Sequence, residues 1–315
     1  MKIVILEGYT VNRGDLSWEI ISVFGELIVY ERMSVDLIAE TCSNAEIILC
    51  NKLPLDRNTI LALPKLKLIC VLATGYNVID IHTAKEKNII VCNVPAYGTT
   101  SVAQHTFALL LELTNQVAIH SRSVAAGEWQ HASDWCYTKT PVIELSDKIL
   151  GIIGFGNIGQ RVARIAKAFG MKIVYNSPHR IETYLAEYVD LRTLFAQSDF
   201  ISLHCPLKND NYQFVNKSLL ELMQPHAFLI NTSRGQLINE NDLARALNRQ
   251  LIAGAALDVL SIEPPIATNP LLSAKNCIIT PHNAWMSKEA RQRIISITAK
   301  NIEAFLKGKP TNVIN

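Results

Sequence analysis

The sequence predicts an α/β protein built from two parallel-sheet domains, on three observations. Apolar runs of strand length alternate with helical patterns along the whole 315-residue chain, as in parallel β/α architecture. A glycine-rich turn, Gly154-Phe155-Gly156-Asn157-Ile158-Gly159, follows one such run near the middle of the chain. The length suits two domains of ordinary size, and 49% hydrophobic residues can fill a large core.

The first block of alternating runs lacks a Gly-x-Gly-x-x-Gly turn. Helical segments such as Asp80–Lys87 separate its runs, so we expect a parallel sheet without a dinucleotide loop. Its predicted strands are Lys2–Leu6, Leu27–Tyr30, Glu46–Cys50, Leu66–Val71 and Ile89–Cys92.

The second block starts near residue 148 and carries the glycine turn between a strand and the amphipathic helix Asn157–Phe169. Six strands arranged around such a turn are typical of a doubly wound Rossmann domain. The predicted strands are Ile149–Ile153, Lys172–Tyr175, Phe200–Leu203, Ala227–Asn231, Gly254–Val259 and Cys277–Thr280.

Two long helices join the blocks. One begins after Gly98 with Thr and Ser residues as N-caps, and its apolar stripe runs from Val102 to Val117. The other, from Ser287 to Lys307, returns the chain to the first block. We therefore predict a discontinuous domain of residues 1–99 and 284–315 and an inserted domain of residues 100–283. Two connections make a hinge, and a cleft between the domains is the expected place for a substrate.

Residues 121–146 fit no strand or helix. They contain Trp129, Trp135 and Tyr137, which predicts an arm that packs on another surface, such as a second subunit.

Composition excludes several classes of protein. The 30 Lys and Arg against 28 Asp and Glu leave a net charge of +2, too balanced for nucleic-acid binding. No apolar run reaches membrane-spanning length, and the chain opens without a secretory signal. The seven cysteines lack Cys-x-x-Cys spacing and the eight histidines lack metal-ligand spacing. We expect buried free thiols, a reducing, cytoplasmic location and no metal.

The three glycines of the central turn suit a dinucleotide. Gly154 allows the tight turn, Gly156 lets backbone amides approach a pyrophosphate, and Gly159 lets helix and strand pack closely. The strand before the turn, and the amphipathic helix and second strand after it, make this context specific.

The end of the next strand departs from the usual dinucleotide pattern. An Asp or Glu is expected there to bind the ribose 2′-hydroxyl, but this chain has Asn176. Asn176 can still bond a hydroxyl, yet it does not repel a 2′-phosphate, which Ser177, His179 and Arg180 could contact. NAD and NADP therefore both remain open.

Three residues with the chemistry of keto-acid reduction each follow a predicted strand: Arg234, Glu263 and His282. The carboxyl ends of strands in a doubly wound sheet line the ligand crevice, so these side chains can converge. A guanidinium, a carboxylate and an imidazole can bind an anionic 2-keto acid and protonate its carbonyl.

These motifs together resemble the D-isomer-specific 2-hydroxyacid dehydrogenase family over nearly the whole chain, and most closely its glycerate dehydrogenase (hydroxypyruvate reductase) branch. The resemblance implies an NAD(P)-dependent oxidoreductase acting on the CH–OH group of D-2-hydroxy acids. It also implies a Rossmann coenzyme domain inserted into a flavodoxin-like substrate domain, and a homodimer. The matching segments are residues 72–78, 93–98, 154–159, 202–206, 231–235, 258–265 and 280–285.

The resemblance also implies residue roles. Arg234 would bind the substrate carboxylate, and backbone amides at Thr74 and Gly75 would cradle it from the first domain. His282 would protonate the carbonyl oxygen, and Glu263 would favour the imidazolium. The implied cofactor-binding residues are Gly154, Gly156, Asn157, Ile158, Gly159, Asn176, Cys205, Pro206, Thr232, Ser233, Arg234, Asp258 and His282.

Two alternatives stay open. One is a reductase of glyoxylate or another 2-keto acid, and the other is a dinucleotide-sensing binding protein of the same fold. The preferred keto acid, the physiological direction and the choice between NAD and NADP are left undecided.

Overall fold

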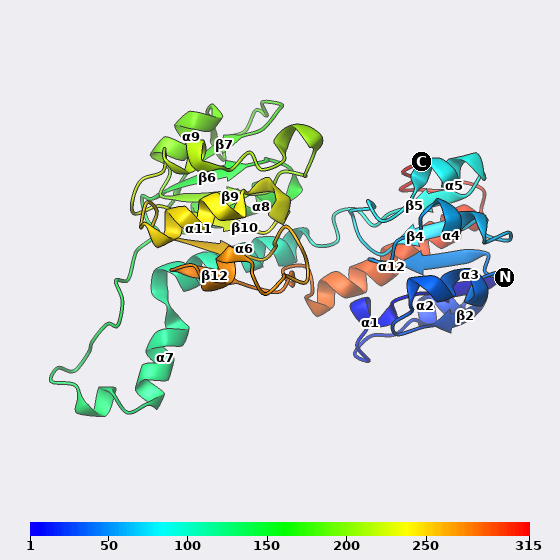
Figure 1. Ribbon diagram of the computed structural model, residues 1–315, viewed down its shortest axis with the longest axis horizontal. Helices are drawn as coiled ribbons and strands as arrows, with labels where there is room; N and C mark the ends of the chain where they lie inside the picture. Colours follow the sequence, from blue (N-terminus) through cyan, green and yellow to red (C-terminus); the bar gives the residue numbers. More distant parts are fainter. The chain divides into compact units, whose positions relative to one another are not determined.

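The computed structural model describes all 315 residues and divides into two compact units (Figure 1). The smaller comprises Met1–Gly98 and Trp285–Asn315, and the larger is the continuous segment Thr99–Ala284. Each unit has one parallel sheet with helices, so the predicted α/β fold class is confirmed.

The smaller unit contains a five-stranded parallel sheet in the order β2-β1-β3-β4-β5. Every residue of β3 and β4 is buried, because apolar clusters cover both faces of the sheet. The strands are β1 Lys2–Ile5, β2 Glu26–Val29, β3 Ile47–Cys50, β4 Leu68–Val71 and β5 Ile90–Cys92.

One long helix and several short ones cover this sheet. The long helix α12 begins after Ser287, whose hydroxyl accepts the Ala290 N–H at 3.2 Å, and its residues Ile294, Ile295 and Ile302 are buried. The helices are α1 Gly8–Val11, α2 Glu19–Ser22, α3 Ile38–Thr41, α4 Arg57–Leu61, α5 Ile81–Glu86 and α12 Lys288–Leu306.

The larger unit contains a seven-stranded parallel sheet in the order β12-β11-β10-β9-β6-β7-β8. The strand order reverses at β6, which lies between β7 and β9, so ligands are expected at the carboxyl ends of these strands. The strands are β6 Ile149–Ile153, β7 Lys172–Asn176, β8 Glu187–Tyr188, β9 Phe200–Leu203, β10 Phe228–Asn231, β11 Gly254–Leu257 and β12 Cys277–Ile279.

Helices cover both faces of the larger sheet, over two apolar clusters. The helices are α6 Thr99–Asn115, α7 Val117–Ala125, α8 Asn157–Ala168, α9 Leu191–Gln197, α10 Lys217–Leu220 and α11 Glu240–Asn248.

Three expectations about this unit were wrong. The sheet has a seventh strand, the short and exposed β8. It was not predicted, because a run of two residues is too short to show an alternation of apolar and polar residues. Residues 121–125 lie in helix α7 rather than in an irregular segment. The buried stripe of α6 does not reach Val117, which is 63% exposed, because Gln116 adopts φ 46° and separates the two helices.

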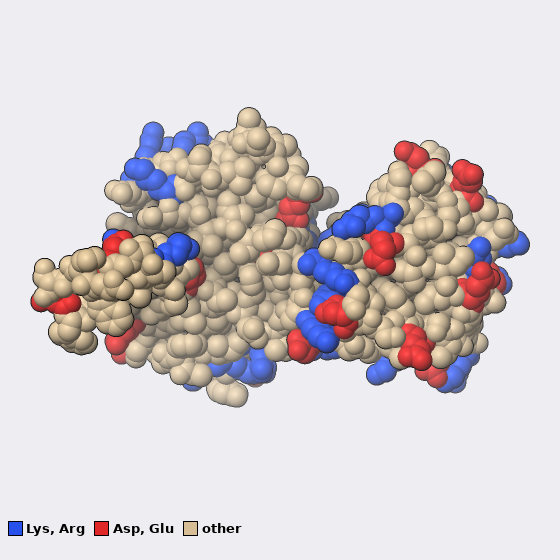
Figure 2. Space-filling view, turned by 90° about the horizontal axis from the view of Figure 1, so that it is seen from below, with Lys and Arg blue, Asp and Glu red and all other residues tan.

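The distribution of surface charge and the burial of the cysteines match what the composition predicts. Basic and acidic side chains lie side by side on the face shown in Figure 2. Cysteines 42, 50, 70, 92 and 205 are buried and unpaired, so the expectation of mostly buried free thiols is confirmed. None of the helices combines the length and apolar character needed to cross a membrane.

Candidate active site

The glycine turn lies between β6 and α8, at the point where the strand order reverses. Gly154 has φ 91°, and a Cβ there would lie 2.5 Å from the Cys205 amide nitrogen. A Cβ at Gly159 would lie 2.2 Å from the Gly154 carbonyl oxygen, so only glycine permits this helix–strand contact. A Cβ at Gly156 would meet no atom within 4 Å, so the space before the helix is open.

The N-terminus of α8 meets that open space without a side-chain cap. Asn157 and Ile158 are its first helical residues, and their N–H groups are among those without intrahelical acceptors. A twelve-residue helix with uncapped N–H groups suits a phosphate, so the loop fits a dinucleotide pyrophosphate.

Asn176 ends β7 beside this turn. Its Nδ2 donates to the Val189 carbonyl at 2.9 Å, and its own carbonyl accepts the Gly154 N–H at 2.8 Å. The amide oxygen of its side chain is therefore the atom left to meet a hydroxyl. Arg180 is exposed, with its guanidinium 5.8 Å from the Tyr188 ring centroid.

Cys205 and Pro206 follow β9 on the other side of the turn. Burial raises the pKa of the Cys205 thiol to about 11, so the thiol stays protonated. The Pro206 carbonyl accepts Asn211 Nδ2 at 2.8 Å. The neighbouring His204 ring has a buried Nδ1 with no partner, and burial lowers its pKa to about 3.

The loop after β10 carries Thr232, Ser233 and Arg234. The Ser233 hydroxyl donates to the Cys205 carbonyl at 2.5 Å, which ties this loop to the one after β9. The Thr232 hydroxyl lies 3.2 Å from that of Thr106. The exposed Arg234 side chain donates from Nη1 to the Ser233 carbonyl at 2.7 Å.

The Arg234 loop packs directly on the loop that carries Glu263. A Cβ at Gly235 would lie 1.9 Å from the Leu260 carbonyl carbon, so the two backbones are in close contact. Gln236 Nε2 also donates to the Ser261 carbonyl at 2.8 Å. Both loops therefore occupy the same edge of the sheet.

His282 and Glu263 form a direct pair. His282 Nδ1 lies 2.6 Å from Glu263 Oε2, and Glu263 Oε1 accepts the Leu260 N–H at 2.9 Å. An ionised carboxylate only accepts hydrogen bonds, so Nδ1 carries the hydrogen and Nε2 is the nitrogen that can face a ligand. The side chains are 27% and 36% exposed, so the pair is accessible to a ligand.

Asp258 holds the backbone of the turn that contains His282. Its main-chain carbonyl accepts the His282 N–H at 2.8 Å, while its carboxylate accepts the N–H groups of Asn283 at 3.0 Å and Ala284 at 2.9 Å. His282 has φ 50°, a left-handed backbone conformation that residues other than glycine rarely adopt without such support. Asp258 is 1% exposed, so these contacts are shielded from water.

His105 and Thr280 extend this network, and neither was predicted as a site residue. The Thr280 hydroxyl donates to Asp258 Oδ1 at 2.6 Å, and His105 Nε2 lies 3.1 Å from that hydroxyl. The only local signal is a His105-Thr106 pair within the apolar stripe of α6.

Thr74 and Gly75 lie in the smaller unit, just after β4. Thr74 Oγ1 donates to the Val94 carbonyl at 2.8 Å, and the Thr74 carbonyl accepts Asn93 Nδ2 at 2.8 Å. The larger unit thus brings together the loops of the other predicted site residues, whereas these two belong to a separate unit.

The chain is similar in sequence and in structure to known dinucleotide-dependent reductases and dehydrogenases. Residues 107–284 match the family model for the D-isomer specific 2-hydroxyacid dehydrogenase, NAD binding domain. The chain is 48% identical to a hydroxypyruvate reductase of Blautia hydrogenotrophica over 322 aligned positions and 100% of both chains. It is 42% identical to a glyoxylate reductase of Thermococcus litoralis, covering 82% of this chain and 80% of the relative. A solved acyclic imino acid reductase (Bsp5) in complex with NADPH and D-Arg superposes with a TM-score of 0.87 at 34% identity, over 100% of both chains.

Proposed function

Because the chain belongs to the D-isomer-specific 2-hydroxyacid dehydrogenase family, we propose that this NAD(P)-dependent oxidoreductase interconverts hydroxypyruvate and D-glycerate. The observation that carries the site assignment is the 2.6 Å pair of His282 and Glu263, on the edge of the sheet that also carries the glycine turn. The full-length similarity to a hydroxypyruvate reductase supports this substrate over other keto acids.

Arg234 binds the substrate carboxylate in this proposal. Its planar guanidinium can form two parallel hydrogen bonds with a carboxylate, and Nη1 is already oriented by the Ser233 carbonyl. The backbone amides of Thr74 and Gly75 would also bind this carboxylate, as the family resemblance implies. The substrate is thereby oriented with its C2 carbonyl toward His282.

His282 exchanges the proton. During reduction the imidazolium gives its Nε2 hydrogen to the carbonyl oxygen, and during oxidation neutral Nε2 takes the hydroxyl hydrogen back. Glu263 keeps Nδ1 protonated, so Nε2 alone changes state. Asp258 fixes the left-handed turn and with it the direction of the ring.

The dinucleotide fits the glycine turn, because the required glycines and the uncapped helix end are present. When bound, its nicotinamide supplies or accepts the hydride at substrate C2. The pyrophosphate would meet Gly154, Gly156 and Gly159 and the amides of Asn157 and Ile158. Thr232, Ser233 and Asp258 would border the cofactor, Asn176 would meet the adenosine ribose, and Cys205 and Pro206 would flank the adenine side.

Parallel assays of NADH and NADPH with hydroxypyruvate, glyoxylate and pyruvate test this function. We expect the highest kcat/KM with hydroxypyruvate. A higher value with glyoxylate would instead favour the activity of the Thermococcus litoralis relative. Tight dinucleotide binding without turnover of any of these three acceptors would refute hydroxypyruvate as the substrate and favour an untested substrate or a dinucleotide sensor.

We also propose a cytoplasmic homodimer. Helix α7 and the segment after it extend away from the sheet of their own unit, and apolar residues there stay exposed: Val117 63%, Trp135 86% and Val142 52% (Figure 1). Contacts within the segment, such as Trp129 Nε1 to the Trp135 carbonyl at 3.0 Å, give it a defined form. Exposed apolar surface of this kind is typical of a subunit interface. The cytoplasmic location is supported by the unpaired cysteines, which suit a reducing compartment.

Analytical ultracentrifugation tests the dimer. We expect the protein to sediment at twice the monomer mass, and Trp135→Ser to weaken the association. A monomer at micromolar concentration would exclude this role for the segment.

A further inference from the structure

The two chain connections between the units are the peptides Gly98–Thr99 and Ala284–Trp285. Enzymes that close around a substrate absorb the motion at a few backbone positions. The residues that hold the backbone on each side of these peptides therefore decide where such a motion takes place.

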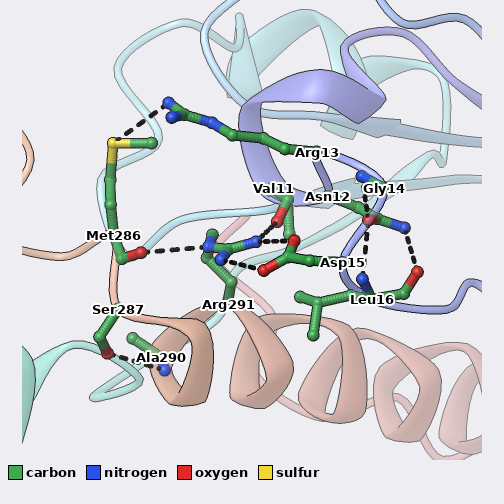
Figure 3. A network of polar contacts seen from close by, with 10 residues as sticks. All are labelled: Val11, Asn12, Arg13, Gly14, Asp15, Leu16, Met286, Ser287, Ala290 and Arg291. Carbon is green, nitrogen blue, oxygen red and sulfur yellow. Dashed lines mark hydrogen bonds and ion pairs between the residues drawn. The ribbon is translucent and has the colours of Figure 1, made fainter.

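Arg291, in the first turns of α12, holds the second connection (Figure 3). Its Nε donates to the Met286 carbonyl at 3.1 Å, and Nη1 donates to the Val11 carbonyl at 3.0 Å. Nη1 and Nη2 each lie 2.7 Å from one carboxylate oxygen of Asp15. Arg291 is 7% exposed, so water does not replace these contacts.

Arg293, two residues further along α12, holds the first connection. Its Nε donates to the Tyr97 carbonyl at 2.7 Å. The Tyr97 ring packs edge-on against Trp285 with 6.0 Å between centroids, so the residues beside the two connections also contact each other. Two residues of one helix thus anchor both connections.

The larger unit holds the same segment from its own side. Ser101 Oγ donates to the Ala284 carbonyl at 2.6 Å, and the Ala284 N–H donates to Asp258 at 2.9 Å. The anchored carbonyls of Ala284 and Met286 are separated by Trp285 alone. His282 lies two residues before Ala284, on the part of the chain fixed to the larger unit.

We propose that Arg291 and Arg293 form a hinge anchor that confines bending to Gly98–Thr99 and to the residues around Trp285. Both are positioning residues: they fix the smaller-unit ends of the two connections, while Asp258 holds the His282 turn to the larger unit. Arg291 suits this task because one planar guanidinium reaches Met286, Val11 and Asp15 at once, which a lysine ammonium cannot do.

Hydrogen–deuterium exchange of the whole protein tests the anchor without relying on activity. We expect Arg291→Lys to speed exchange by about tenfold in peptides covering residues 284–288, since charge-assisted hydrogen bonds are lost. Arg293→Lys should have this effect at residues 96–99. Exchange in β1, β3 and β4 should remain at the wild-type rate.

Arg57→Lys is the matched control. Arg57 also pairs with a carboxylate in the smaller unit, Glu86 at 3.1 Å, but both side chains are 58% exposed and contact neither connection. The proposal would be overturned if the exchange rate at residues 284–288 in Arg291→Lys equalled the rate in Arg57→Lys. It would also be overturned if exchange in Arg291→Lys rose equally throughout the smaller unit.

A kinetic test rests on the proposed function. We expect Arg291→Lys to change kcat and the KM for the keto acid by about fivefold while the dinucleotide Kd stays constant, because the glycine turn lies within the larger unit. Equal loss of dinucleotide affinity would contradict the anchor role. If the wild-type protein reduces no keto acid, the proposed function fails, and the exchange experiment still decides the anchor.

Discussion

Replacement of Glu263 by glutamine tests the proposed proton transfer directly. Glutamine retains an acceptor oxygen for the Leu260 N–H, now 2.9 Å from Glu263 Oε1, so the loop keeps its support. The other oxygen, 2.6 Å from His282 Nδ1, becomes an NH₂ group. Two N–H groups would then face each other whenever the imidazole is protonated, so the imidazolium loses its partner.

The expected fall in kcat follows from the loss of a charge-assisted hydrogen bond between Glu263 and His282. A hydrogen bond to a charged group contributes about 1.5–3 kcal/mol, or roughly 10- to 150-fold in rate if it is lost in the transition state. Because the Glu263 side chain is 36% exposed, water compensates in part. We therefore expect kcat for keto-acid reduction to fall by about 10- to 30-fold.

Steady-state reduction at saturating dinucleotide measures this change, with dinucleotide affinity measured separately by fluorescence titration. Glu240→Gln is the matched control, because the Glu240 carboxylate supports the same loop through Ser261 and Asn269 without contacting His282. A wild-type kcat in Glu263→Gln, or an equal loss in the control, would refute the proton-transfer argument.

Three further predictions concern other parts of the larger unit. Arg234→Lys should lower kcat/KM by about 100-fold, mainly through a higher KM, since an ammonium cannot bind a carboxylate with two parallel bonds; initial rates over a range of keto-acid concentration check this. Asn176→Asp should weaken NADPH binding by about tenfold relative to NADH, because a carboxylate repels a 2′-phosphate; competitive titration of both dinucleotides measures it. His204 has its pKa lowered to about 3 by burial, so the unfolded chain binds the extra proton first as the pH falls below the ordinary histidine value. Between about pH 6 and 4, the free energy of unfolding should therefore decrease by about 1.4 kcal/mol per pH unit more in the wild type than in His204→Gln, as urea titrations would show.

Much of the fold could be predicted because most buried strands are apolar runs with few polar residues inside them. The predicted Ile149–Ile153 and Phe200–Leu203 have the observed bounds of β6 and β9. Strand β8 could not be predicted, since its two residues pair with β7 only in the folded sheet.

The site was predictable only in part. Strand order places the loops of Arg234, Glu263 and His282 at one edge of the sheet, which chain alternation alone can indicate. The left-handed turn at His282 could not be predicted, because it depends on the buried Asp258 carboxylate. Pairs such as Arg291 and Asp15 lie 276 residues apart, and no local pattern links them.

The divided sequence of the smaller unit sets the order in which the protein can fold during synthesis. The segment Met1–Gly98 leaves the ribosome long before α12, whose Ile294 and Ile295 cover one face of its sheet beside Ile3 and Leu49. The part of that face under α12 stays uncovered while the larger, continuous unit is made and folds. Aggregation is therefore most probable in this interval, and a chaperone would be needed most before α12 is translated.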